Sequence, residues 1–251
     1  MPSLISSLTP TLTAGVNAVQ KGIVDTRTQL ASGSRILNAA EVGIVTRLTA
    51  QAAGYKSVTQ NITAGTNVIN VGSTALNSIT SILSQAKDIA TQAANAGLQT
   101  SDRTALNTTF SQLLAQVTSL VANASVNGEN VLLSGGGNLT VQSGITGGTA
   151  SQTTISNLAI SLSSLGVNAS TVTSQASAQT AIDALTTALS TVSTNQSTMS
   201  ATKTGLDSSA AAALSLSTNL QATVDSIQAV DQTALQAKLQ QLNNSNPLTI
   251  T

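Results

Sequence analysis

Hydrophobic positions near the N-terminus recur with the spacing of a helix. They fall three, four or seven residues apart, which places them on one stripe of an α-helix. The residues of this stripe are Ile5, Leu8, Leu12, Val16, Val19, Ile23 and Leu30. Because the stripe is nearly as narrow as the seam of a coiled coil, it favours a partner helix over a core of its own. Pro10 must lie in the first turn or cause a kink, so we expect a secure helix only beyond it.

Helical spacing returns in three further segments. The first runs from about residue 41 to 96, and a helix of some fifty residues would be on the order of 75 Å long. Asn95-Ala96-Gly97 is typical of a helix end, and Ser101-Asp102 of a helix start. The helix that starts there is expected to close near Asn127-Gly128. The last segment spans about 177–242, and the residues after it are predicted to fray.

The pattern between residues 127 and 175 is different. Glycines separate short runs in which apolar and polar residues alternate, and alternation is the period of a β-strand. Such runs occur at Leu139 and Val141, and again at Leu158, Ile160 and Leu162. The predicted fold is therefore mainly α: a long antiparallel coiled-coil or helical-bundle rod with a small β-hairpin insert at about 131–175.

Charge is unusually scarce. Charged residues make up 7% of the 251 residues, and nine basic residues balance nine acidic ones, whereas about a quarter is usual. No charge occurs in residues 57–86 or 130–182. Because soluble monomers usually keep their net charge away from zero, we expect this chain to associate. An uncharged surface on an extracellular polymer is the alternative.

The residue types that are missing exclude several functions. The chain has no His, Cys or Trp, and its only aromatic residues are Tyr55 and Phe110. The usual ligands of zinc, haem and iron–sulfur clusters are therefore absent, as are His-dependent triads and Cys nucleophiles. Nine scattered cations form no phosphate-tracking patch, which argues against nucleic-acid binding. No acid has a neighbouring base or nucleophile, so we expect neither an enzyme nor a cofactor.

Two further features concern membranes and export. The first charged residue is Lys21, so no basic region precedes an apolar core and no Sec signal is expected. No run of about 18 apolar residues exists, so membrane insertion is not expected. If the chain is exported, it must use a route that reads a different signal.

Interface residues are expected in two groups. The C-terminal stripe, with Leu220, Val224, Ile227, Leu235, Leu239 and Leu242, is expected to pack with the N-terminal stripe between subunits, and an intramolecular hairpin is the alternative. The second group contains Arg27, Arg35 and Arg47, for which we expect inter-subunit pairs with Asp25, Glu41 or other acids. The alternative is solvated surface charge, worth under about 1 kcal/mol each.

Several blocks of sequence together resemble bacterial flagellins. Leu30-Ala-Ser-Gly-Ser-Arg-Ile36 is similar to the family signature Leu-Ser-Ser-Gly-x-Arg-Ile, and the stretch from Ala53 to Val71 resembles the one that follows it. Ala86–Asn95 resembles Arg-Glu-Leu-Ala-Val-Gln-Ala-Ala-Asn. Further matching blocks are Ser101-Asp-Arg, Asn127-Gly-Glu-Asn-Val-Leu-Leu133, Ala181–Leu185 and Asn219-Leu220. The resemblance covers roughly residues 1–133 and 177–242, and the order and spacing of the blocks make it specific.

The resemblance implies a subunit that polymerises into the extracellular flagellar filament for swimming. Residues 1–38 and 212–251 would form the inner coiled-coil domain that lines the filament, and 39–211 the rod domain, without hypervariable outer domains. The implied partners are further copies of the chain, an export chaperone, the flagellar type III export apparatus, and cap and hook-associated proteins. The Ser/Thr-rich insert at 134–175 would either accept O-linked sugars or be a bare polar surface.

The sequence also departs from the family pattern. Glu41 is the one acid where most members carry an Asp-Asp pair, about four residues are deleted before Arg47, and the C-terminal arm is short. Members that Toll-like receptor 5 detects carry an Arg, a Leu and a Glu at the positions that align with Gln85, Ile89 and Thr109. Because the Arg and the Glu are absent here, weak or no detection is expected.

Two alternatives to a filament subunit remain. A hook-filament junction protein shares the terminal helices but caps or bridges instead of polymerising. A secreted, non-polymeric helical adhesin belongs to a different class. A membrane-active form of it would need basic polar faces, and the sequence lacks them.

Overall fold

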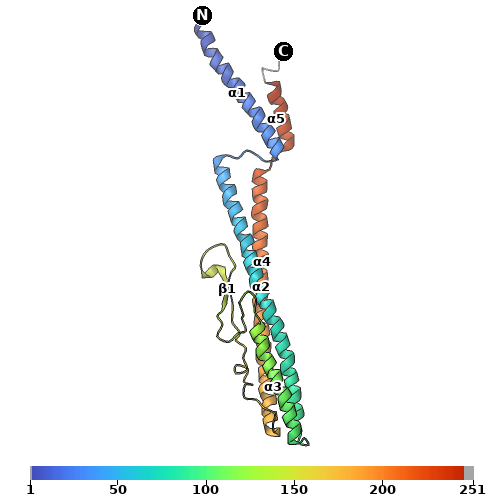
Figure 1. Cartoon of the computed structure of the whole chain (residues 1–251). Helices are drawn as coiled ribbons and strands as arrows, with labels where there is room; N and C mark the ends of the chain where they lie inside the picture. The colour runs from blue at the N-terminus through green and yellow to red at the C-terminus, as the bar shows by residue number, and fades with distance from the viewer. Residues whose placement is uncertain (1, 246–251) are drawn as a thin grey trace. The chain divides into compact units, whose positions relative to one another are not determined.

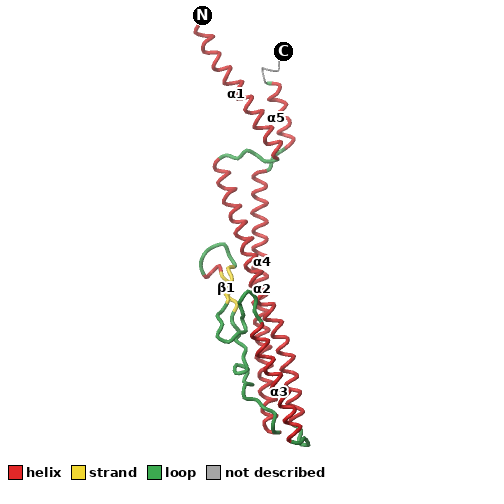
Figure 2. The backbone as a smooth tube through the Cα atoms, viewed as in Figure 1, coloured by secondary structure: helices red, strands yellow, loops and turns green. Residues whose placement is uncertain are grey.

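The computed structural model of the chain describes residues 2–245, with side chains from residue 10 onward. The described part contains five α-helices and a two-stranded sheet joined by loops. Figure 1 shows their arrangement, and Figure 2 shows that most of the backbone is helical. The elements are α1 (Pro2–Ser32), α2 (Ala39–Ala93), α3 (Thr100–Asn123), β1 (Leu139–Gln142), β2 (Gln152–Ile155), α4 (Gln175–Gln228) and α5 (Gln232–Asn244). The predicted mainly-α fold with long helices and a small β-hairpin is confirmed.

Contacts divide the chain into two compact units. Unit 1 is Met1–Ala53 with Leu216–Thr251, and unit 2 is Gly54–Ser215. Unit 1 therefore contains α1, α5, the start of α2 and the end of α4. Unit 2 contains the rest of α2 and α4, with α3 and the β-insert. The sequence suggests an inner domain of residues 1–38 and 212–251 and a rod domain of residues 39–211. Because these domains are defined by their place in an assembled polymer, they stay a prediction.

The core of unit 2 lies between α2, α3 and α4. The connection between α2 and α3 is only six residues long, which suits antiparallel neighbours. Each helix buries an apolar stripe at helical spacing, and full burial of such a side chain contributes about 1.5–3 kcal/mol. The most buried members are Ile69, Leu76, Ile79 and Leu83 of α2, Phe110 and Val117 of α3, and Leu185, Val192 and Leu206 of α4.

The β-insert packs on α2 at a glycine. A Cβ atom at Gly65 would lie 2.6 Å from Cγ2 of Val141, so only glycine allows the hairpin to approach this closely. In the antiparallel pair, Val141 of β1 lies opposite Thr153, and Leu139 lies opposite Ile155. Val141 and Ile155 are buried, whereas Thr140 and Thr154 are exposed. The alternation of apolar and polar residues that predicted a strand at Leu139 and Val141 thus follows the alternation of more buried and exposed side chains along β1.

The second strand differs from the prediction. The sequence indicated a second strand at Leu158–Leu162 without assigning its partner, but the strand that pairs with β1 is Gln152–Ile155. Residues 158 and 160 donate backbone hydrogen bonds to Val131 O and Leu132 O, at 2.7 and 2.8 Å. Ala159 between them has a φ of 30°, which interrupts the extended backbone, so an apolar alternation there does not make a strand.

Several helix ends also differ. α3 begins one residue earlier than expected, where Gln99 and Asp102 form a capping box, and it ends at Asn123. The helix predicted over 177–242 is broken: α4 ends at Gln228, and Asp231 caps α5 by accepting a 2.9 Å bond from the N–H of Ala234. Pro10 lies inside α1 and not in its first turn. Of the predicted frayed tail, 246–251 lie outside the described residues.

Candidate assembly surfaces

Helices α1 and α5 pack on each other in unit 1 through a glycine and a leucine. A Cβ atom at Gly22 would lie 3.2 Å from Cδ1 of Leu242, so the absent side chain makes room for the leucine. The next turn buries Ile23 and Thr26. The hydroxyl of Thr26 donates to Gly22 O at 2.7 Å, which satisfies the buried polar group. The predicted apolar seam therefore contains one helix–helix contact within the chain.

The two terminal stripes are covered only in part. Ile23 and Val224 are buried, and Leu12 is 68% exposed. The half-buried members are Val16, Val19, Leu30, Leu220, Ile227, Leu235, Leu239 and Leu242. Ile5 and Leu8 lie outside the residues whose side chains are described. One chain by itself thus leaves much of the predicted stripe in contact with solvent.

Unit 1 exposes further apolar side chains that the stripe did not include. Val24 is 61% exposed and Ile36 53% exposed, and Val42, Ile44 and Leu216 are also exposed. Among its described residues, by contrast, unit 1 buries only Ile23, Ala52 and Val224 as apolar side chains. In the described part of unit 1, therefore, large apolar side chains that are exposed outnumber the apolar side chains that are buried. The signal in the sequence is a second row of apolar residues beside the stripe, as at Val24.

The linker between α1 and α2 is held by a cluster of hydrogen bonds within unit 1. Asn38 and Glu41 form a reciprocal cap at the start of α2: each side chain accepts from the other's backbone N–H, both at 2.9 Å. The second carboxylate oxygen of Glu41 binds Arg35 Nη2 at 2.7 Å. Arg35 also donates from Nε and Nη2 to Ile227 O, at 3.2 and 3.1 Å. One arginine therefore ties the linker to the end of α4.

These bonds set the electrostatics of the cluster. The backbone N–H of Asn38, and then the side chain of Arg35, hold the pKa of Glu41 below its ordinary value of 4.5. The pairing of Arg35 with Glu41 lies within one chain, although the sequence suggested a pair between subunits. Arg27 and Arg47 are exposed and form no ion pair with any residue of the described part.

The positions from which the sequence predicts weak detection by Toll-like receptor 5 lie on α2 and α3. Gln85 and Thr109 are exposed, and Ile89 is half-buried against the core of unit 2. The amide of Gln85 donates to Ser81 Oγ at 3.4 Å. The exposed side chains at these positions, those of Gln85 and Thr109, are therefore uncharged and polar.

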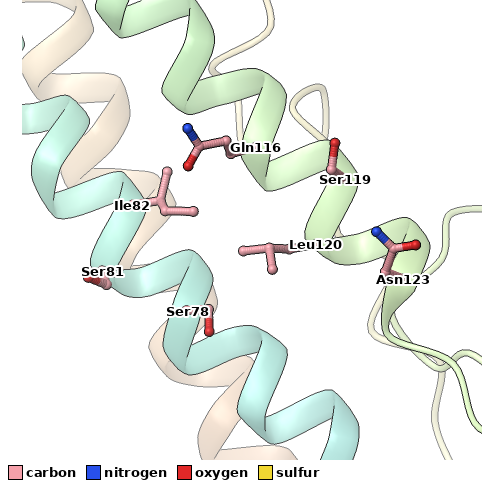
Figure 3. Close-up of a pocket in the computed structure, with 7 residues that line it drawn as sticks. All are labelled: Ser78, Ser81, Ile82, Gln116, Ser119, Leu120 and Asn123. Atoms are coloured by element: carbon pink, nitrogen blue, oxygen red, sulfur yellow. The ribbon is translucent and has the colours of Figure 1, made fainter.

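A groove runs along unit 2 between α2 and α3 (Figure 3). Its cavity volume is about 410 Å³, and a second cavity of about 330 Å³ continues it through shared lining residues. The first cavity is lined by Ser78, Ser81, Ile82, Gln116, Ser119, Leu120 and Asn123, and none of these is ionisable. Sequence reasoning missed this groove because it exists only once the two helices pair.

The described residues lack two kinds of feature. No helix in the described part is long and apolar enough to cross a membrane. Nor does the described part contain three or more His, Cys, Asp or Glu side chains grouped so that they could hold a metal ion.

Known proteins resemble this chain in sequence and in fold. The family model of the bacterial flagellin N-terminal helical region matches residues 5–136. No curated protein sequence matches the chain. Among solved structures, the crystal structure of Bacillus cereus flagellin aligns with a TM-score of 0.54 and 24% sequence identity, over 61% of this chain and 87% of that one; at this identity the match concerns the fold alone. Because the family model spans more than half of the residues, the chain belongs to the bacterial flagellin family.

Proposed function

We propose that copies of this chain polymerise through unit 1 into the flagellar filament that drives swimming. The observation that carries the proposal is the apolar surface of unit 1, which a single chain leaves uncovered. Leu12, Val24 and Ile36 are all more than half exposed. Completing the burial of one such side chain contributes on the order of 1–2 kcal/mol, so a contact that covers several of them favours association.

The residues proposed for the inner core of the filament are those of the two terminal stripes. Their partial burial supports this assignment, because α1 and α5 contact each other at Gly22 and Leu242 but leave Leu12 in solvent. A helix with one covered and one uncovered side can contact its own partner and a neighbouring copy at once. Arg27 and Arg47, exposed on unit 1, are proposed to pair with acids of neighbouring copies.

Family membership also supports a route of export for the chain and a location outside the cell. The chain is proposed to leave the cell through the flagellar type III export apparatus with an export chaperone, and to end in an extracellular filament bounded by hook-associated and cap proteins. Long helices with mainly local contacts suit this route, since they fold quickly after transit. Mass spectrometry of residues 134–175 from native filaments would distinguish O-linked sugars from a bare polar surface.

Electron microscopy before and after heat dissociation and seeded reassembly tests polymerisation. Long filaments are expected from the unaltered protein. The variant Leu12→Asp places a charge in the proposed core and should stay monomeric with unchanged helicity. Asn17→Asp adds the same charge on the other side of α1 and should still polymerise. Discrete monomers or short caps from the unaltered protein, even with seeds, would favour the junction protein or the adhesin. Filaments of Leu12→Asp like those of the unaltered chain would refute the role of unit 1.

Weak detection by Toll-like receptor 5 is proposed from Gln85 and Thr109. Both side chains are exposed on unit 2 and neither carries the charge of the recognised members. Purified monomer should leave receptor-bearing reporter cells near their baseline. Gln85→Arg combined with Thr109→Glu should raise the response, and strong activation by the unaltered monomer would contradict the proposal.

A further inference from the structure

One leucine of the β-insert is held at the surface by its own backbone. Leu133 is 45% exposed. Its N–H donates to Asn130 Oδ1 at 3.1 Å, and its carbonyl accepts from the N–H of Gly136 and from Nδ2 of Asn157, each at 3.1 Å. A residue whose backbone is already held in place loses less conformational entropy when its side chain binds a partner than a residue of a mobile loop does. Leu133 therefore has the properties of a preorganised anchor.

The groove between α2 and α3 has a complementary character. Ile82 and Leu120 are half-buried and project into the space between the two helices, with Ser78, Gln116 and Ser119 around them (Figure 3). The groove's volume of about 410 Å³ is far above the ~10–15 Å³ that one water molecule needs, so the groove has room for a side chain. Apolar side chains at the centre of the groove and uncharged polar side chains at its edges suit an aliphatic side chain of a partner whose backbone N–H and C=O groups lie close to it.

Charge restricts what this groove can bury. Residues 57–86 of α2 and 104–123 of α3 carry no charge, so a charged partner would find no counter-ion and would bury its charge at high cost. The insert meets this requirement, because residues 130–182 form the longest uncharged stretch of the chain. Leu133 lies within that stretch and is not one of the residues that line the groove. A second copy of the chain can thus supply the occupant.

We propose that Leu133 of one copy inserts between Ile82 and Leu120 of a second copy. The proposal rests on the proposed function and names one contact between subunits in the filament. Because the leucine and the groove are different surfaces, each copy uses both, and the contact is heterologous. A heterologous contact whose rotation does not close generates an open-ended polymer, as a filament requires.

Cysteine crosslinking tests the contact directly, since the natural chain has no cysteine. In Leu133→Cys with Ser119→Cys, oxidation of assembled filaments should give a ladder of covalent oligomers beyond the dimer. A disulfide forms only where Cα atoms come within about 7 Å, so the ladder reports close approach. Either single variant should give no ladder. Leu133→Cys with Thr204→Cys, an exposed position on α4 outside the groove, should give none either.

A charge variant provides the second measurement. Leu133→Asp should keep the circular dichroism and melting temperature of the unaltered protein, because the side chain is exposed, and should raise the critical concentration for assembly at least tenfold. Thr140→Asp, exposed on β1, is the matched control and should change it less than threefold. Filaments that give no ladder, together with normal assembly of Leu133→Asp, would overturn the contact and leave the proposed function standing. No filaments from the unaltered chain would overturn both.

Discussion

Arg103 closes the connection between α2 and α3, and its removal should destabilise unit 2. Its guanidinium donates to three backbone carbonyls: Nε to Ala93 O at 2.9 Å, Nη1 to Leu98 O at 2.9 Å and Nη2 to Asn95 O at 2.7 Å. These oxygens lie at the end of α2 and in the loop after it, where the helix dipole is negative and the helix leaves its own acceptors unpaired. Arg103→Met keeps most of the apolar stem and removes all three donors.

The size of the loss can be estimated from these bonds. A hydrogen bond to a charged group contributes about 1.5–3 kcal/mol. Three bonds from one side chain are not additive, and the bond to Asn95 O is exposed, so water replaces part of it. We expect Arg103→Met to lower the free energy of unfolding by about 2–4 kcal/mol. Arg103→Lys keeps the charge without the planar fork and should lose an intermediate amount.

Urea unfolding of the monomer followed by circular dichroism measures the loss, and hydrogen exchange localises it. Exchange should accelerate in residues 94–99 before it changes in the core of unit 2. Arg47→Met is the control, because Arg47 is exposed and has no ion-pair partner among the described residues; it should change stability by less than about 0.5 kcal/mol. A loss below about 1 kcal/mol in Arg103→Met, with unchanged exchange in 94–99, would refute the reasoning.

Two further predictions concern the linker and the insert. The pKa of Glu41 is lowered in the folded state, so the contribution of its carboxylate to stability is complete above the unfolded pKa and is lost as the pH falls below 4.5 through the folded pKa. The difference in free energy of unfolding between the unaltered protein and Glu41→Gln should therefore shrink as the pH falls below 4.5. A constant difference in urea titrations on both sides of this pH would contradict the prediction. Gly65→Ala would place a Cβ atom 2.6 Å from Cγ2 of Val141. This overpacking should lower the free energy of unfolding by about 1–3 kcal/mol, whereas the higher helix propensity of alanine should raise it by about 1 kcal/mol. Gly43→Ala has nothing within 4 Å and should show the gain alone, so equal urea midpoints for the two variants would rule out the close approach.

The sequence by itself determined the helices. Apolar residues at helical spacing located α1, α2, α3 and the body of α4, because a helix buries one stripe whatever it packs against. The alternation at Leu139 and Val141 located β1 for the corresponding reason. The ordered blocks that resemble flagellins pointed to the family, and the family model confirmed it over residues 5–136.

Contacts between distant residues decided the rest. The strand that pairs with β1 is set by the path of the chain between the two strands, which apolar alternation does not specify. The alternation at Leu158–Leu162 predicted a strand there, but it could not reveal that Ala159 interrupts the extended backbone. The break before α5 has a local signal in the capping residue Asp231, but apolar spacing continues through it and predicts one uninterrupted helix. The partner of Arg35 depends on the path of the linker past Ile227.

The candidate assembly surfaces divide in the same way. The terminal stripes could be read from the chain, since their spacing is local. Their partial exposure, the apolar surface around Val24 and Ile36, and the groove at Ile82 and Leu120 could not. Periodicity specifies which side of a helix is apolar, whereas exposure depends on which neighbours cover that side, and neighbours far apart in sequence are brought together only by the tertiary fold.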